Sequence, residues 1–272
     1  AGETVTVLDA RASSEFEEWR IEGETVETAN VPYFQFLDGV DGDLLSQVPE
    51  GDPLVVLCAK GGASEYVAGV LKEAGRDVVH LADGMNGWAR LYERSEVTAY
   101  DGPGTVYQYR RPSSGCLSYL VVDGGEAAVV DPLREFADRY REDAAALDAT
   151  LRYALDTHVH ADHVSGVRAL DDAGVRGVVP EAAVDRGVRY ADVVERIEDG
   201  ETLPVGDAGI EAVHTPGHTT GMTSYLVGGS LLATGDGLFV ESVARPDLEE
   251  GDDGAPDAAR TLYESLHERV LA

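Results

Sequence analysis

The sequence predicts an α/β protein of two domains, and three observations support that prediction. The chain has 272 residues, which is enough for two domains of ordinary size. Short apolar runs alternate with helix-like segments in residues 1–98, as in a parallel sheet covered on both faces. In residues 99–272, closely spaced strands come first and helices alternate with strands afterwards. We place the boundary between the two patterns in a stretch that contains Gly and Pro.

Apolar runs and helical periodicity define the elements expected in the first domain. Strands are predicted at Thr4–Leu8, Leu54–Leu57 and Val78–Leu81. Helices are predicted at Ser13–Arg20, Ser64–Glu73 and Asn86–Glu93. Because strands and helices alternate along the chain, the strands are expected to be parallel.

The second domain is expected to contain more strands. They are predicted at Val106–Tyr109, Leu117–Val122, Ala127–Val130, Leu151–Leu155, Val175–Val179, Ile210–Val213, Thr223–Val227 and Leu231–Ala233. Helices are predicted at Glu135–Leu147, His163–Ala173 and Pro256–Leu271. The first strands follow one another through short turns, which indicates an antiparallel start.

The charge of the chain excludes several classes of partner. Asp and Glu number 51 against 21 Lys and Arg, which gives a net charge of −30. Such a surface repels phosphate backbones and anionic lipids, so we expect neither nucleic acid nor a membrane as a partner. The absence of a run of 18 apolar residues in the sequence agrees with this expectation. The acidic, lysine-poor composition resembles that of halophilic proteins, in which salt screens the self-repulsion.

The ends of the sequence and its cysteines bear on processing and location. The chain begins without methionine and without a signal-peptide pattern, and we interpret it as a trimmed fragment. Its two cysteines, Cys58 and Cys116, are too few for a disulfide framework and favour a cytoplasmic location. The sequence leaves the oligomeric state open, a homo-oligomer included.

Cys58 is a candidate for sulfur chemistry, in the stretch "LCAKGGASEYVAGVL". It follows a predicted buried strand and precedes a glycine-rich loop that turns into a helix. Loop N–H groups, the helix N-terminus and the nearby Lys60 all favour a thiolate. The alternative interpretation is a small buried residue at the end of a strand.

Four motifs of the first domain together resemble the rhodanese family of sulfurtransferases. They are "LDARASSEF", "NVPY", "CAKGGA" and "HLADGMNGWAR", in the family's order. The resemblance implies a parallel sheet with helices on both faces, which is short at its N-terminus here. It also implies that Cys58 carries a persulfide sulfur. The loop N–H groups that would surround this sulfur belong to Lys60, Gly61, Gly62 and Ala63.

A second chemical site is indicated by three motifs, each at the end of a predicted strand. "LDTHVHADHVSG" supplies His158, His160, Asp162 and His163. "VHTPGHTTG" and "LLATGDGLF" supply His214, His218 and Asp236. Side chains at strand ends can converge on one edge of a sheet, and imidazole with carboxylate is a typical ligand set of borderline metals. The sequence therefore predicts a metal site.

Three of the seven histidines are not interpreted as metal ligands. His214 ends an apolar strand and is interpreted as structural or as supporting the ligands. His80 is interpreted as structural in the first domain. His267 lies in a segment with helical periodicity and is interpreted as an ordinary helix residue.

The metal motifs resemble the metallo-β-lactamase superfamily, and within it the persulfide dioxygenase branch, which includes fusions to rhodanese. The resemblance implies an αββα sandwich with one Fe(II) held at its edge by His158, His218 and Asp236. Such a triad leaves positions open for a substrate thiolate and O₂. The remaining motif residues would fix the loop and hydrogen-bond to bound water, namely His160, Asp162 and His163.

We therefore expect Fe(II)-dependent oxidation of a low-molecular-weight thiol persulfide to sulfite by O₂, coupled to sulfane-sulfur transfer at Cys58. The first alternative is a thioester hydrolase similar to glyoxalase II, with two Zn ions that Asp236 bridges. A second metal would then use His160, Asp162 and His163, and a further ligand beyond residue 272, where this domain is expected to be short. The second alternative is a persulfide sensor, whose metal would be structural and closed by four protein ligands.

Overall fold

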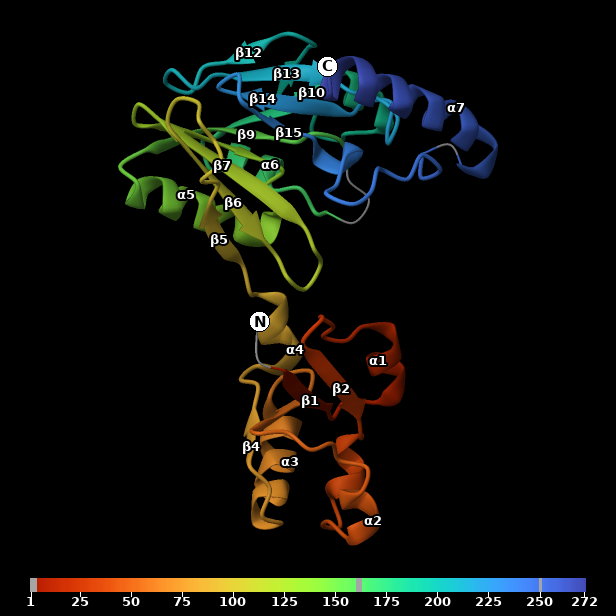
Figure 1. Cartoon of the computed structure of the whole chain (residues 1–272). Helices are drawn as coiled ribbons and strands as arrows, with labels where there is room; N and C mark the ends of the chain where they lie inside the picture. Colours follow the sequence, from red (N-terminus) through yellow and green to blue (C-terminus); the bar gives the residue numbers. More distant parts are fainter. Residues whose placement is uncertain (1–3, 160–162, 250) are drawn as a thin grey trace. The chain divides into compact units, whose positions relative to one another are not determined.

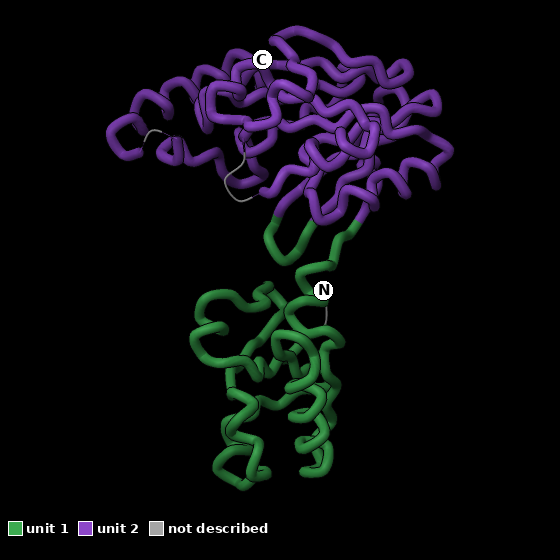
Figure 2. The backbone as a smooth tube through the Cα atoms, turned by 180° about the vertical axis from the view of Figure 1, so that it is seen from behind, with its two compact units in different colours: residues 1–93, 111–115 green, residues 94–110, 116–272 purple. Residues whose placement is uncertain are grey.

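The computed structural model describes residues 4–159, 163–249 and 251–272. The chain divides into two compact units, Ala1–Glu93 with Arg111–Gly115, and Arg94–Arg110 with Cys116–Ala272 (Figure 2). The first unit contains a four-stranded sheet, and the second contains one sheet of seven strands and one of four (Figure 1). Within the described residues, every helix is too short or too polar to cross a membrane.

The first unit is built on parallel strands in the order β2-β1-β3-β4. Its strands are β1 (Val5–Asp9), β2 (Val26–Asn30), β3 (Leu54–Leu57) and β4 (Val78–His80). Its helices are α1 (Ser13–Glu18), η1 (Tyr33–Phe36), α2 (Gly42–Leu45), α3 (Gly62–Glu73) and α4 (Gly84–Ala89). Leu8 and Leu71 belong to the core between the sheet and α3, and Leu57 packs with Met85 of α4 on the other face. The predicted parallel sheet with helices on both faces is confirmed.

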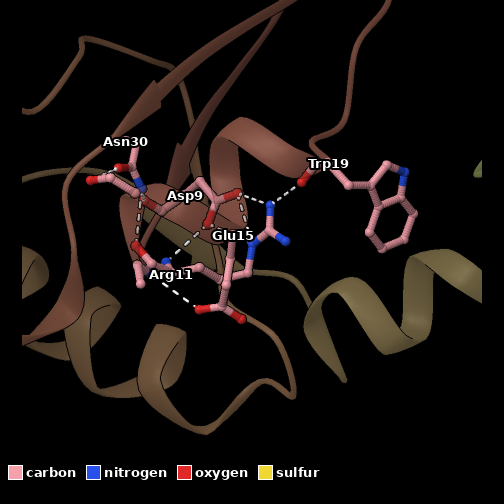
Figure 3. A network of polar contacts seen from close by, with 7 residues as sticks. Asp9, Arg11, Glu15, Trp19 and Asn30 are labelled. Atoms are coloured by element: carbon pink, nitrogen blue, oxygen red, sulfur yellow. Dashed lines mark hydrogen bonds and ion pairs between the residues drawn. The ribbon is translucent and has the colours of Figure 1, made fainter.

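A buried ion pair anchors the carboxyl end of β1 (Figure 3). Arg11 Nη2 donates to Asp9 Oδ2 and to the Trp19 carbonyl, each at 2.6 Å, and the two charged side chains are 6% and 1% exposed. The Asn30 amide donates to the Asp9 and Arg11 carbonyls at 2.9 and 3.0 Å. The Glu15 carboxylate accepts from the backbone N–H that precedes α1. These contacts give the "LDARASSEF" motif a structural role in the loop after β1.

The second unit contains two sheets, with strand orders β11-β10-β9-β8-β7-β6-β5 and β12-β13-β14-β15. The larger sheet comprises β5 (Glu93–Glu96), β6 (Thr105–Arg110), β7 (Leu117–Asp123), β8 (Glu126–Val130), β9 (Thr150–Leu155), β10 (Arg176–Pro180) and β11 (Glu195–Ile197). The smaller comprises β12 (Thr202–Leu203), β13 (Ile210–His214), β14 (Thr223–Val227) and β15 (Leu231–Ala233). Strands β6 to β8 are antiparallel and β8 to β11 are parallel.

The two sheets of the second unit pack face to face. Leu155 and Val130 of the larger sheet share one core with Ile210 and Tyr225 of the smaller. Helices α5 (Ala137–Ala146) and α6 (Val167–Asp172) pack against strands of the larger sheet (Figure 1). Helix α7 (Gly251–Ser265) lies on the loop after β13. This α/β sandwich agrees with the predicted fold class.

Several boundaries differ from the sequence-based expectations. The helix expected over Asn86–Glu93 ends at Ala89, and Glu93–Glu96 form the edge strand β5 instead. All four residues of β5 are exposed, so no alternation of apolar residues marks it. Helix α6 begins at Val167 rather than at His163. The last helix begins at Gly251, before the expected Pro256, and its final turn is π-helical.

Candidate metal centre and cysteine loop

Three metal-capable side chains converge at the carboxyl ends of strands from both sheets. His158 follows β9, His218 lies in the loop after β13, and Asp236 lies in η4 (Gly235–Gly237), which follows β15. One ligand atom of each lies within 4.8 Å of the others. The Nε2 atoms of His158 and His218 are 3.7 and 3.8 Å from the same atom, Asp236 Oδ2.

Hydrogen bonds indicate which ring nitrogen of each histidine carries the proton in the neutral ring. His218 Nδ1 lies 3.1 Å from the Arg245 carbonyl oxygen, which can only accept, so Nδ1 carries the proton. His158 Nδ1 lies 2.9 Å from Thr157 Oγ1. The Thr157 hydroxyl donates to the Asp131 carboxylate at 2.9 Å, so it accepts from His158. In the neutral form of each ring, the lone pair of Nε2 is therefore directed towards the shared carboxylate.

This donor set fits a divalent transition-metal ion. Two imidazole lone pairs and a carboxylate oxygen face one point, and they repel one another unless a cation lies between them. The side chains of His158 and His218 are 2% and 8% exposed, whereas Asp236 is 39% exposed. Among the residues that the structure describes, two buried rings and a partly open carboxylate come together here, which makes three ligands rather than the four that close a structural site.

A cavity of about 590 Å³ lies beside His158. Tyr190 lines it, and burial followed by the charge of Asp156 raises the pKa of this phenol above its ordinary value. Tyr190 therefore keeps its proton at neutral pH and remains a hydrogen-bond donor. The cavity is also lined by the arginines Arg134, Arg168 and Arg189. Asp156 and Asp172 line it too, and Arg168 pairs with Asp172 at 2.6 Å, so the donors that the cavity offers next to a metal ligand are Arg134, Arg189 and Tyr190.

The other candidate ligands of the "THVHADH" motif are described by the structure only in part. His163 is buried, and its Nε2 lies 3.2 Å from the Pro132 carbonyl oxygen. This contact ties the metal loop to the segment after β8. His160 and Asp162 lie outside the described residues. The supporting or second-metal role expected for these three side chains stays a prediction.

The three histidines interpreted without a metal have other surroundings. The backbone N–H of His214 donates to Asp199 Oδ1 at 2.7 Å, and burial lowers the pKa of the His214 ring. The ring centroid of His267 lies 4.2 Å from that of Tyr263, one turn earlier in the last helix. His80 is exposed on β4.

Two residues that the sequence motifs do not include also shape the site. Asp131 is 6% exposed and also accepts from the Thr157 backbone N–H at 2.7 Å. The feature of the sequence that points to Asp131 is its position directly after the apolar strand β8, which neighbours β9 in the sheet. Gly235 has a φ of +49°, and a Cβ there would overlap the Thr157 hydroxyl. Glycine thus allows the chain before Asp236 to approach the residue behind His158.

Cys58 lies where β3 ends and the loop turns into α3. Its Sγ accepts a hydrogen bond from the Gly61 N–H at 3.1 Å. Burial raises the pKa of Cys58, but the Ser64 hydroxyl and the N–H groups of Ser64, Lys60 and Gly61 outweigh it, so the pKa falls below its ordinary value. Gly62 and Ala63 are the first two residues of helix α3. The loop therefore favours the nucleophilic thiolate.

A second turn closes over the cysteine loop. Gly84 has a φ of +53°, and a Cβ there would overlap the Cys58 carbonyl oxygen. This close approach lets the Met85 N–H donate to that carbonyl at 2.8 Å, and the Asn86 N–H donates to the Ala59 carbonyl at 3.1 Å. Gly84, the first glycine of the "HLADGMNGWAR" motif, thus fixes the backbone of the cysteine loop.

Known proteins match both units. The metallo-beta-lactamase superfamily model matches residues 112–272, and the rhodanese-like domain model matches residues 1–91. Mitochondrial persulfide dioxygenase ETHE1 of Bos taurus is 32% identical over 182 residues, which cover 65% of this chain and 67% of that protein. Cytoplasmic hydroxyacylglutathione hydrolase of Arabidopsis thaliana is 35% identical over 159 residues, covering 55% and 56%. The crystal structure of ETHE1 from Myxococcus xanthus matches with a TM-score of 0.50 and 33% identity, over 60% of this chain and 68% of that one. The chain therefore belongs to the metallo-beta-lactamase superfamily and carries a rhodanese-like domain ahead of its metallo-beta-lactamase domain.

Proposed function

We propose that this chain oxidises a low-molecular-weight thiol persulfide to sulfite with O₂ at one Fe(II) ion, and transfers sulfane sulfur at Cys58. The observation that carries the proposal is the triad of His158, His218 and Asp236, in which the carboxylate is 39% exposed and His158 also lines the cavity. Two imidazoles and one carboxylate leave metal positions for a thiolate and O₂. The similarity to persulfide dioxygenase ETHE1 of Bos taurus supports the same reaction.

The proposed reaction is R–S–SH + O₂ + H₂O → R–SH + SO₃²⁻ + 2 H⁺. An Fe(II) ion held by His158, His218 and Asp236 would activate O₂, and the persulfide supplies the electrons that reduce it. The protein holds the ligand rings by their Nδ1 atoms, through the Arg245 carbonyl and the Thr157 hydroxyl. The Tyr190 phenol and the cavity arginines orient an anionic substrate by charge and hydrogen bonding.

Sulfur transfer at Cys58 uses the thiolate as a nucleophile. The thiolate attacks the outer sulfur of R–S–SH, a new S–S bond forms, and the old one breaks with release of R–S⁻. The N–H groups of the cysteine loop stabilise negative charge on the enzyme persulfide. Both proposed reactions share the species R–S–SH, so joining the two domains in one chain raises its local concentration.

Metal content and oxygen uptake test the metal proposal. Protein purified without oxygen is expected to hold one iron per chain and to consume O₂ when a small-thiol persulfide is added. Two zinc ions per chain, with thioester hydrolysis and no oxygen uptake on persulfide, would contradict it.

A pair of variants tests whether the two sites act independently. Cys58→Ala removes the loop nucleophile, so sulfur transfer to cyanide is expected to vanish while oxidation of added persulfide persists. His218→Ala removes one of three iron ligands and is expected to do the reverse. If folded, iron-loaded Cys58→Ala no longer oxidises added persulfide, then Cys58 is an obligatory carrier and the sites are not independent.

A di-metal thioester hydrolase is the second candidate. Its support is the 35% identity to hydroxyacylglutathione hydrolase of Arabidopsis thaliana. It requires a second metal close to the first, for which His160, Asp162 and His163 are the candidate ligands. Metal stoichiometry therefore separates the two candidates directly.

A further inference from the structure

A short segment after Asp236 holds the loop that carries His218 at two points. The Arg245 carbonyl accepts from His218 Nδ1 at 3.1 Å. Four residues later, the Glu249 carboxylate accepts from the Thr220 N–H at 2.5 Å and from the Thr220 hydroxyl at 2.9 Å. We call residues 245–249 the clasp. His218 is thus part of a closed ring of covalent and hydrogen bonds that runs through Glu249.

The clasp also reaches one wall of the 590 Å³ cavity. Glu249 forms an ion pair with Arg186, the last residue of η3 (Glu181–Arg186). Ala183 of the same helix lines the cavity and lies directly against the His218 loop, because a Cβ at Gly221 would overlap the Ala183 backbone. Glu249 therefore joins the metal-ligand loop and the cavity wall at a point where their backbones touch.

The Glu249 contacts are shielded from solvent. The side chains of Glu249 and Arg186 are 18% and 23% exposed. Replacing the carboxylate would leave the Thr220 N–H and the Arg186 guanidinium without this partner in a partly buried place, which is costly. The orientation of the His218 ring depends on the same segment, because the Arg245 carbonyl holds its Nδ1.

We propose that Glu249 is a positioning residue for the metal ligand His218. It holds Thr220 and the clasp in fixed relation, so that the Arg245 carbonyl meets the ring and Nε2 points at Asp236. The proposal rests on the metal site of the proposed function, but not on which reaction that site performs. Loss of groups that orient a ligating histidine lowers metal affinity by about 10- to 100-fold. Since Glu249 acts through the backbone, we expect the lower end of that range.

Binding of Co²⁺ to the full chain, measured against a chelator and by visible absorption, tests the proposal. Glu249→Ala removes the carboxylate, and Glu249→Asp keeps the charge but is one methylene too short to reach both partners. Both are expected to weaken Co²⁺ binding about tenfold and to alter the absorption bands. The matched control is Glu195→Ala, which removes an acid that pairs with Arg176 at 2.5 and 2.6 Å on the larger sheet. The control is expected to leave binding and spectrum unchanged.

Four outcomes decide the matter. Parental Co²⁺ affinity and spectrum in folded Glu249→Ala would overturn the proposal, and if that variant does not fold, the same result in Glu249→Asp would overturn it. An equal loss in Glu195→Ala would overturn it as well, because the effect would then be one of net charge. Retained Co²⁺ binding in His218→Ala would instead show that the metal site is wrong, which separates failure of the proposed function from failure of this inference.

Discussion

Thr157→Val removes the link between a metal ligand and a buried carboxylate. In the parent protein, His158 Nδ1 donates to the Thr157 hydroxyl, which in turn donates to Asp131. Valine has nearly the same volume as threonine but neither accepts nor donates. The variant therefore leaves the His158 Nδ1–H without its acceptor, while Asp131 keeps the Thr157 backbone N–H at 2.7 Å.

The size of the effect follows from these contacts. Loss of a hydrogen bond to a charged group costs about 2 kcal/mol of the free energy of unfolding. For a unit of this size, that loss lowers the melting temperature by about 4–8 °C. Metal affinity falls further, by about tenfold or about 1.4 kcal/mol, because the ring of His158 is no longer held in the tautomer that presents Nε2.

The assay compares Co²⁺ dissociation constants and melting temperatures for the metal-free and metal-loaded protein. Thr215→Val is the matched control, since Thr215 is 3% exposed and its hydroxyl lies 2.8 Å from the Ser224 hydroxyl. The control is expected to lose about 1 kcal/mol of unfolding free energy and to bind Co²⁺ like the parent protein. If Thr157→Val binds Co²⁺ as tightly as the parent, the hydrogen-bond chain to Asp131 does not orient His158.

Three further predictions concern the cysteine loop, the first unit and the whole chain. Ser64→Ala removes a hydroxyl that lowers the Cys58 pKa, so the half-maximal pH for alkylation of Cys58, followed by mass spectrometry, should move upward; an unchanged profile refutes the assigned cause. Arg11→Ala leaves Asp9 buried and unpaired, which should cost about 3–5 kcal/mol in urea unfolding followed by Trp fluorescence; a loss below about 1 kcal/mol argues against a buried charge pair. With a net charge of −30, the melting temperature should rise with KCl up to about 1 M, where the Debye length is about 3 Å; a flat dependence contradicts the halophilic interpretation.

The sequence was informative wherever function depends on local order along the chain. His158, His218 and Asp236 each follow an apolar strand, and strand ends are where side chains can leave a sheet towards a common point. The structure places their ligand atoms within 4.8 Å of one another, and their role as metal ligands is part of our proposal. Cys58 likewise stood out because a buried strand, a glycine-rich loop and a helix succeed one another there.

The sequence was uninformative where a contact depends on segments far apart in the chain. Asp131 supports His158 from 27 positions away, and only the pairing of β8 with β9 brings the two together. Strand β5 is exposed along its whole length, so its place in the sheet comes from backbone hydrogen bonds that leave no apolar pattern. Glu249 resembled the many other surface acids of the chain because nothing in its neighbourhood predicts contact with Thr220.

The acidic composition and the geometry of the metal site are connected. In a chain with 51 acids and 21 basic residues, the acids outnumber their possible cationic partners, so carboxylates across the surface repel one another. Molar salt screens exposed pairs such as Arg245–Asp247, whose arginine is 70% exposed, more than shielded pairs such as Arg186–Glu249. Salt that relieves the repulsion across the surface therefore leaves the Glu249 contacts largely intact. The closed ring of covalent and hydrogen bonds that runs through Glu249 and holds His218 can then persist at the ionic strength that stabilises the fold.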